Sequence, residues 1–451
     1  MSANQERTAG RWLIRGARQL GGRPADILID GQVITEVLAN RSGGGRPDQD
    51  VVVIDAAGLI AFPGLVDLHT HLREPGREDA ETVESGTAAA ALGGFTAIRA
   101  MANTDPVADT AGVVEQVWRL GRQAGNCDVR TVGAVTTGLG GSQLAELGAM
   151  ADSAAQVRVF SDDGQCVADA TLMRRALEYV KAFDGVIAQH AQEPRLTTGA
   201  QLNEGEMSAR LGLQGWPAVA EEAVVARDCL LAAHVGSAMH VCHVSTAGSV
   251  EIIRWAKSKG WRVSAEVTPH HLLLTDDLAT GYDPVYKVNP PLRTAEDVAA
   301  LRAGLADGTI DCVATDHAPH PAESKETEWS DASFGMTGLE TALRVVHEAM
   351  VSTGALDWAG VADRMSVRPA GIGRIGRHAT ALGNLRHGCP IEEGFPANFV
   401  LYDPEPITAV DPAGHASRSR NSPFAGMKLP GQVVATFLRG TPTVLEGKLT
   451  R

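Results

Sequence analysis

The sequence predicts an α/β fold, a (β/α)8 TIM-like barrel with a small β-sandwich domain formed by the two chain ends. Eight apolar runs, each ending in polar residues, recur between residues 61 and 320 and are mostly separated by helical patterns, as in a barrel of eight strand and helix units. Shorter alternating runs bounded by glycine and proline lie before and after this region, which is typical of β structure. A chain of 451 residues can bury one large core and a smaller one.

The two ends of the chain have the same strand-like character. The first part contains the runs "RWLIRGARQL", "ADILIDGQVITEVLA" and "VVVIDAAG", and the last part contains "ANFVLYDPE", "QVVATFLRG" and "TPTVLEGKL". We expect these runs to pack together as one β domain. The predicted division is therefore residues 1–61 and 378–451 for the β-sandwich and residues 62–377 for the barrel.

The barrel strands are predicted from eight runs in chain order. They are "AFPGLVDLHTH", "GFTAIRAMANT", "VRTVGAVTTG", "VRVFSDDG", "GVIAQHAQE", "AMHVCHVST", "RVSAEVTPHH" and "DCVATDHAPH". The alanine-rich stretch after the first run ends in two glycines, as a helix C-terminus should. After the last run, Thr337 and Glu340 have the spacing of a helix capping box.

Composition and charge limit the possible functions. The chain has 44% hydrophobic and 21% charged residues, which is ordinary for a globular protein. A net charge of −14 disfavours nucleic acid as a partner. The sequence has a polar opening, no apolar stretch of membrane length, and six cysteines without Cys-x-x-Cys spacing. These features predict a cytoplasmic protein without a membrane span.

Histidine and aspartate residues gather where the predicted strands end. His69 and His71 in "DLHTHLREPG" are one residue apart and therefore point to the same side of an extended strand. Later runs end with Asp162 or Asp163, His190, His243 and Asp316. The carboxyl ends of barrel strands meet at one mouth, and more than four nitrogen and oxygen donors exceed what one tetrahedral zinc ion uses. The sequence therefore predicts two metal ions.

Two motifs carry a resemblance to a known family. "HTHLREPG" together with "ATDHAPHPAESK" resembles the metal-dependent amidohydrolases, and specifically the dihydroorotases of the longer-chain bacterial class. The resemblance covers essentially the whole chain. It implies two Zn²⁺ ions per chain, the first on His69, His71 and Asp316, the second on His190 and His243, with one bridging group.

The bridging group is predicted to be an aspartate. The similar hydantoinases, dihydropyrimidinases and allantoinases usually use a carbamylated lysine from the fourth strand, but no lysine precedes Lys181 here. Either Asp162 or Asp163 must then bridge. The family pattern favours Asp163, which also shares a strand face with Val157 and Val159.

The resemblance also implies the substrate and the residues that bind it. The expected reaction is the reversible cyclisation of N-carbamoyl-L-aspartate to (S)-dihydroorotate plus water in pyrimidine (UMP) biosynthesis, with Asp316 transferring the proton. A guanidinium can hold the substrate carboxylate through two hydrogen bonds. The expected substrate-binding residues are Arg73, Asn103, Asn289 and His320, with the backbone of Phe334 and Gly335. The loop from His320 to Met336 is a candidate to move over the substrate.

Two other functions remain open at this point. The chain could hydrolyse a related ring such as a hydantoin or allantoin, or it could be an inactive scaffold for aspartate transcarbamoylase, although scaffold subunits lose metal ligands and this sequence keeps them. A homo-oligomer and docking with aspartate transcarbamoylase are further expectations.

Several neighbouring residues are given supporting roles. His240 and Cys242 are predicted to face the helices, and Asp67 is expected to orient an imidazole. His270 and His271 are expected to support the metal ligands or to have a structural role, rather than to bind a metal. Gln192 stands where relatives often have an acidic residue, which puts a supporting role there in doubt.

Overall fold

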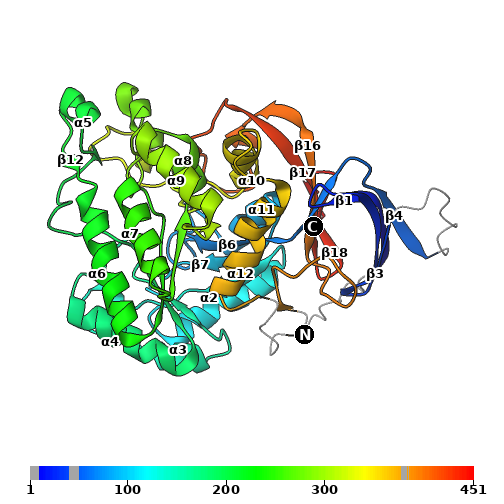
Figure 1. Ribbon diagram of the computed structural model, residues 1–451, viewed down its shortest axis with the longest axis horizontal. Helices are drawn as coiled ribbons and strands as arrows, with labels where there is room; N and C mark the ends of the chain where they lie inside the picture. The colour runs from blue at the N-terminus through cyan, green and yellow to red at the C-terminus, as the bar shows by residue number, and fades with distance from the viewer. Residues whose placement is uncertain (1–9, 40–49, 377–382, 384, 451) are drawn as a thin grey trace.

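The chain forms a closed barrel and a β sheet made from its two ends, which lie side by side in Figure 1. The structure is a computed structural model that describes residues 10–39, 50–376, 383 and 385–450. The predicted fold class is confirmed: parallel strands build the barrel, and a separate, mostly antiparallel sheet contains the strands of the chain ends.

All eight predicted apolar runs contribute a strand to the barrel. These strands are β6 (Leu65–Thr70), β7 (Phe95–Ala100), β8 (Asp128–Thr131), β9 (Val159–Phe160), β10 (Val186–Gln189), β13 (Ala238–Val241), β14 (Val263–Val267) and β15 (Cys312–Val313). They form one three-stranded and one five-stranded parallel sheet. Parallel backbone pairs between Gly133 and Phe160, and between Thr70 and His317, join the two sheets into a closed ring.

Helices cover the outside of this ring, as Figure 1 shows. They are α1 (Val83–Leu92), α2 (Ala111–Ala124), α3 (Leu147–Asp152), α4 (Ala170–Val180), α6 (Val219–Val235), α7 (Ala247–Ser258), α8 (Pro269–Leu273), α9 (Ala295–Asp307), α10 (Ala342–Val346), α11 (Trp358–Ala362) and α12 (Arg368–Ile372). An excursion after β10 carries β11 (Leu202–Asn203), α5 (Glu206–Leu211) and β12 (Gly215–Trp216). Helix α1 ends at Gly93 as predicted. Within the described residues, no helix combines the length and apolar character needed to cross a bilayer.

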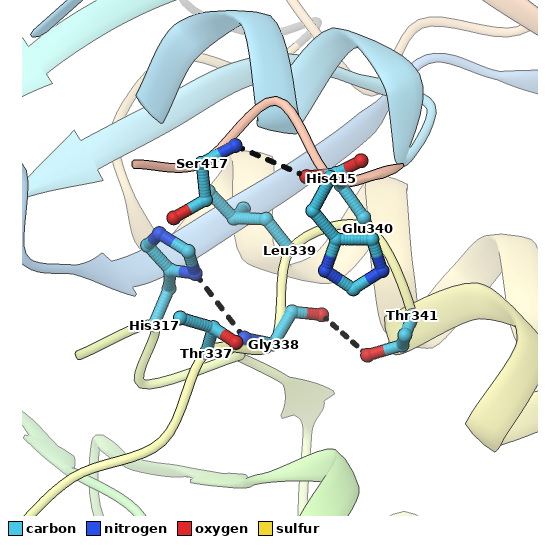
Figure 2. A pocket seen from close by; sticks show the side chains of 8 residues that line it. All are labelled: His317, Thr337, Gly338, Leu339, Glu340, Thr341, His415 and Ser417. Carbon is cyan, nitrogen blue, oxygen red and sulfur yellow. Dashed lines mark hydrogen bonds between the residues drawn. The ribbon is translucent and has the colours of Figure 1, made fainter. Parts of the chain in front are cut away.

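The predicted capping box at Thr337 and Glu340 is wrong. Helix α10 begins only at Ala342. The Glu340 Oε1 atom instead accepts hydrogen bonds from the backbone N–H groups of Ala416 and Ser417, at 2.9 and 3.3 Å, a contact that Figure 2 shows in part. The carboxylate therefore serves a distant segment of the chain rather than its own helix.

The charge of Glu340 is expected to make stability depend on pH. Burial raises the pKa of the Glu340 carboxyl from 4.5 to about 7. The folded chain thus holds this proton more tightly than the unfolded chain. The contribution of the protonated carboxyl to the unfolding free energy is therefore present at low pH and lost as the pH rises through about 7. Glu340→Gln keeps an oxygen acceptor without the charge. It should raise the unfolding free energy at pH 8 by up to about 3 kcal/mol and change it little at pH 5.

Denaturant unfolding at the two pH values checks this expectation. Glu348→Gln is the control, since Glu348 is an exposed residue nearby. An equal effect of Glu340→Gln at both pH values would show that its charge is not the cause.

Within the described part of the chain, the sheet of the chain ends contains nine strands. They are β1 (Arg11–Gln19), β2 (Pro24–Asp30), β3 (Val33–Ala39), β4 (Val51–Asp55), β5 (Ile60–Pro63), β16 (Phe399–Ala409), β17 (Lys428–Leu438), β18 (Thr441–Leu445) and β19 (Lys448–Leu449). A register shift between Ile14 and Ala17 divides β1, so its first half pairs with β4 and its end with β5. The two ends thus form one continuous hydrogen-bonded sheet.

The first predicted strand run divides between the two parts of the molecule. Residues 60–63 pair with β16 in the end sheet, and residues 65–70 enter the barrel. Between them, a side chain at Gly64 would collide with Thr96. Phe62 and Pro63 therefore belong to the end sheet, beyond the predicted boundary at residue 61. The second predicted boundary, at residue 377, lies outside the described residues.

Alternating residues of β16 join the two cores. Val400 and Tyr402 pack in the large barrel core, whereas Phe399 and Leu401 pack in the smaller core of the end sheet. Successive side chains of a strand point to opposite faces, so this one strand contributes to both cores. Five of the six cysteines are also buried and act as small core residues.

Candidate metal centre and active site

The six predicted metal ligands converge on one buried point at the barrel mouth. They come from the ends of five strands, β6, β9, β10, β13 and β15, and all are buried. Asp163 lies at the centre: its Oδ1 atom is 3.2 Å from His69 Nε2, 3.2 Å from His190 Nδ1 and 3.3 Å from His243 Nε2. Its Oδ2 atom is 3.4 Å from His71 Nε2.

These contacts form two groups of possible ligands that share Asp163. One group is His69, His71 and Asp163, and the other is Asp163, His190 and His243, with ligand atoms within 4.8 Å of one another in each. Asp316 lies beside the first group, with its Oδ1 atom 3.0 Å from His71 Nε2 and 3.4 Å from His69 Nε2. Two donor sets that share a carboxylate could hold a pair of metal ions close together.

The two neighbouring aspartates have different surroundings. Asp162 Oδ1 accepts hydrogen bonds from the backbone N–H groups of Val135 and Thr136, at 2.8 and 2.9 Å. Its other oxygen accepts from the Thr136 hydroxyl. Asp162 therefore ties its loop to the end of the neighbouring strand, while Asp163 faces the histidines.

Acceptors behind three of the histidine rings fix how these rings face Asp163. His69 Nδ1 lies 2.7 Å from Glu266 Oε1, His71 Nδ1 2.9 Å from Asn103 Oδ1, and His190 Nε2 2.7 Å from Gln192 Oε1. An acceptor on the far nitrogen holds the hydrogen there, so the lone pair of the near nitrogen points to the centre. His69 Nε2 is buried without a hydrogen-bond partner. These nitrogen and carboxylate donors fit divalent zinc.

The backbone is unusual at three of the predicted site residues. Arg73, His243 and Asp316 have positive φ values of 62°, 31° and 48°, a conformation that costs free energy for residues other than glycine. The turn at His243 interrupts strand alternation after β13. Strained backbone of this kind clusters at active sites.

Two sequence predictions about supporting residues are wrong. His240 and Cys242 lie inside the barrel with Glu266, not against the helices, because the left-handed turn at His243 breaks the alternation that the prediction assumed. Asp67 accepts hydrogen bonds from the backbone of His69 and Thr315 rather than from an imidazole.

Glu266 was missed by the sequence analysis. Its Oε1 atom contacts His69 Nδ1, and its Oε2 atom lies 2.9 Å from His240 Nε2. Burial raises the pKa of Glu266, but hydrogen bonds from His240 and His69 outweigh burial and hold the pKa at about 2. A lone carboxylate between apolar residues of strand β14 was the available signal, since a buried charge needs a partner.

The predicted carboxylate-binding residues lie together beside the metal centre. Arg73 donates from Nε to the carbonyl of Pro319 at 3.1 Å, and its Nη2 is 3.5 Å from His320 Nε2. His320 Nε2 is 2.8 Å from the carbonyl oxygen of Phe334. Burial, together with the Arg73 cation, lowers the pKa of His320 to about 3, so this imidazole is neutral. Gly335 has φ of 139°, and a Cβ atom there would lie 2.8 Å from His320 Nε2.

The two predicted asparagines flank the metal centre on different sides. Asn103 contacts His71, whereas Asn289 donates from Nδ2 to Gln192 Oε1 at 3.1 Å. Asn289 Oδ1 is buried and has no hydrogen-bond partner. Gln192 thus links His190 to Asn289, which answers the doubt raised by the absence of an acidic residue there.

Comparison with known proteins identifies the family. A family model described as Dihydro-orotase-like matches residues 58–249. A dihydroorotase of Streptomyces coelicolor is 67% identical to this chain, covering 97% of this chain and 99% of that protein. The chain belongs to the dihydroorotase family. A dihydroorotase of Mycobacterium tuberculosis, 54% identical over 97% of this chain and 99% of that protein, supports the same assignment.

A solved structure places the dihydroorotase family within a wider class. The L-hydantoinase (dihydropyrimidinase) of Arthrobacter aurescens has a TM-score of 0.84 and 27% identity to this chain, covering 98% of both chains. The resemblance predicted from the sequence is therefore confirmed. This dihydroorotase-family chain is an enzyme of the cyclic amidohydrolase class, and its described residues include candidate metal-binding groups.

Proposed function

We propose that the chain is a two-zinc dihydroorotase that interconverts N-carbamoyl-L-aspartate and (S)-dihydroorotate plus water in pyrimidine biosynthesis. The observation that carries the proposal is the position of Arg73 and neutral His320 beside the centre around Asp163. A guanidinium there suits a ring substrate that carries a carboxylate. Hydantoin and allantoin rings offer no such group.

The proposed metal ligands are the six converging side chains. His69, His71 and Asp316 would hold one Zn²⁺, His190 and His243 the other, with Asp163 between them. Bound zinc supplies Lewis-acid polarisation of an amide carbonyl and lowers the pKa of a bound water. Glu266, Asn103 and Gln192 fix the imidazoles of His69, His71 and His190 from behind.

The protein's own residues bind the substrate and move the proton. Arg73 and His320 hold the carboxylate, and Asn289 offers its buried amide oxygen to the ring. When water adds to the ring carbonyl, Asp316 takes a proton from the water and passes it to the ring nitrogen as the carbon–nitrogen bond breaks. Ring closure uses the same residues in reverse order.

Metal analysis and a substrate panel test the proposal. We expect about two zinc ions per chain and ring opening of dihydroorotate in clear preference to hydantoin and allantoin. A preference for a ring without a carboxylate would instead support the hydantoinase-like function. A metal-free protein without turnover would support the scaffold function. Homo-oligomer formation, docking with aspartate transcarbamoylase and a cytoplasmic location stay predictions.

A further inference from the structure

We infer that Asn421, which lies far along the chain between β16 and β17, is a positioning residue for the substrate carboxylate site. It belongs to a segment that we call the C-terminal strap, residues 415–422. The strap crosses from the end sheet to the barrel mouth and touches the loops that carry Arg73, His320 and Gly335. The inference rests on the proposed function, because it concerns a carboxylate-bearing substrate.

Every hydrogen-bonding group of the Asn421 side chain is used. Oδ1 accepts from the backbone N–H of His320 at 3.2 Å. Nδ2 donates to the carbonyl oxygens of Ala318 at 3.0 Å and Gly335 at 3.2 Å. The backbone carbonyl of Asn421 also accepts from Thr337 N–H at 3.1 Å. Asn421 is buried, with 6% of its surface exposed, so water does not readily replace these bonds.

The three partners of the amide lie at the two ends of the long segment between β15 and α10. Ala318 and His320 follow β15 closely, whereas Gly335 lies nearer to α10. The first end supplies the His320 imidazole, which contacts Arg73, and the second supplies the backbone of Phe334 and Gly335. A single amide that bonds to both ends fixes the distance between them. A hydrogen bond from Ala318 N–H to the Met336 carbonyl, at 2.8 Å, runs alongside it.

Two carboxylates, those of Glu81 and Glu340, hold the strap against the barrel. Glu81 Oε1 accepts from the Arg418 backbone N–H at 3.0 Å, while its Oε2 accepts from the Ser417 hydroxyl and lies 3.2 Å from His317 Nε2. Glu340 accepts from the strap backbone on the other side. Figure 2 shows Ser417 and Glu340 together, with His317 bonded to Gly338 close by. The strap is therefore a fixed support.

The same strap also touches the loop of Arg73. The Ser419 hydroxyl donates to the Ala80 carbonyl at 2.8 Å, and Ala80 N–H in turn donates to the Arg77 carbonyl at 3.0 Å. Arg77 N–H donates to the Arg73 carbonyl at 3.0 Å. The strap thus connects both sides of the carboxylate site, while within the described residues none of its hydrogen bonds reaches a predicted metal ligand.

Substitution of Asn421 should weaken substrate binding without removing the metals. Asn421→Leu has a similar size but no amide, so His320 and Gly335 lose their common partner. We expect KM for dihydroorotate to rise about 10- to 100-fold, with kcat changed much less and zinc content unchanged. Asn421→Asp keeps the acceptor for His320 N–H but loses both donors. Its KM should therefore lie between those of the wild type and Asn421→Leu.

The matched control is Asn398→Leu. Asn398 is also buried and also bonds two backbone segments, the Arg386 carbonyl and the Arg439 N–H, but it lies immediately before β16 of the end sheet. Thermal unfolding with and without saturating dihydroorotate gives a readout independent of turnover. The ligand-induced rise in Tm should shrink in the Asn421 variants and persist in Asn398→Leu.

The outcomes separate this inference from the proposed function. If wild type turns over dihydroorotate but both Asn421 variants keep its KM and ligand-induced Tm shift, the inference is wrong and the function stands. A parallel loss of zinc, kcat and stability in the Asn421 and Asn398 variants would show a merely structural role. If the wild type does not turn over dihydroorotate, both the inference and the proposed function are wrong.

Discussion

Asp163→Ala should remove both zinc ions and lower kcat/KM for dihydroorotate by at least about 10³-fold. The reason is geometric: one carboxylate lies within 3.4 Å of all four predicted histidine ligands. Without it each donor set loses its shared negative charge. Two zinc ions held by the four imidazoles would then repel each other with no anion between them. Zinc analysis of the dialysed variant and steady-state kinetics provide the measurement.

The adjacent carboxylate is the matched control. Asp162→Ala removes hydrogen bonds to Val135 and Thr136, so it should lower stability while the folded fraction keeps its zinc. If Asp162→Ala loses the metals and Asp163→Ala retains them, the bridging assignment is reversed. Full turnover by Asp163→Ala would refute a bridging aspartate altogether.

Asp316→Asn should have the second largest effect, a fall in kcat of about 10³- to 10⁴-fold. An amide is close in size to the carboxylate but cannot accept and return the proton. Because the overall equilibrium does not depend on the enzyme, ring opening and ring closure should slow by the same factor in kcat/KM. Measuring both directions by the ultraviolet absorbance of the ring checks this equality.

Asp311→Asn is the control for Asp316→Asn. Asp311 immediately precedes the same strand, β15, but bonds to Lys257 and to the backbone of Ala265 at the opposite end of the barrel. The Asp311→Asn variant should change stability but keep the wild-type kcat/KM for both ring opening and ring closure. A normal kcat for the Asp316→Asn variant would show that Asp316 does not transfer the proton.

The parts of the structure that sequence predicted best depend on local periodicity. Apolar runs that end in polar residues give barrel strands, and His69, His71 and Asp163 lie where those strands stop. The capping interpretation of Thr337 and Glu340 failed because the true partners of Glu340 lie 76 and 77 residues later in the chain. Local spacing carries no information about such contacts.

The supporting residues were harder to predict for the same reason. Glu266 meets His69 across 197 positions and Asn421 meets Ala318 across 103, so no short motif contains either pair. The orientation of His240 was mispredicted because the prediction assumed that strand alternation continues to His243, whereas the positive φ of His243 turns the chain after β13. Backbone conformation of this kind follows from the assembled barrel rather than from alternation along one strand.

The pairing of β5 with β16 has a consequence for how the enzyme is made. Residues 60–63 cannot form their antiparallel pairs with residues 399–402 until those residues leave the ribosome, more than three hundred residues later. Until then the edge of β5 is open, and the strap that orients the carboxylate-binding loops does not exist. Synthesis of the final sixth of the polypeptide therefore completes the sheet of the chain ends and adds the strap to the carboxylate-binding loops.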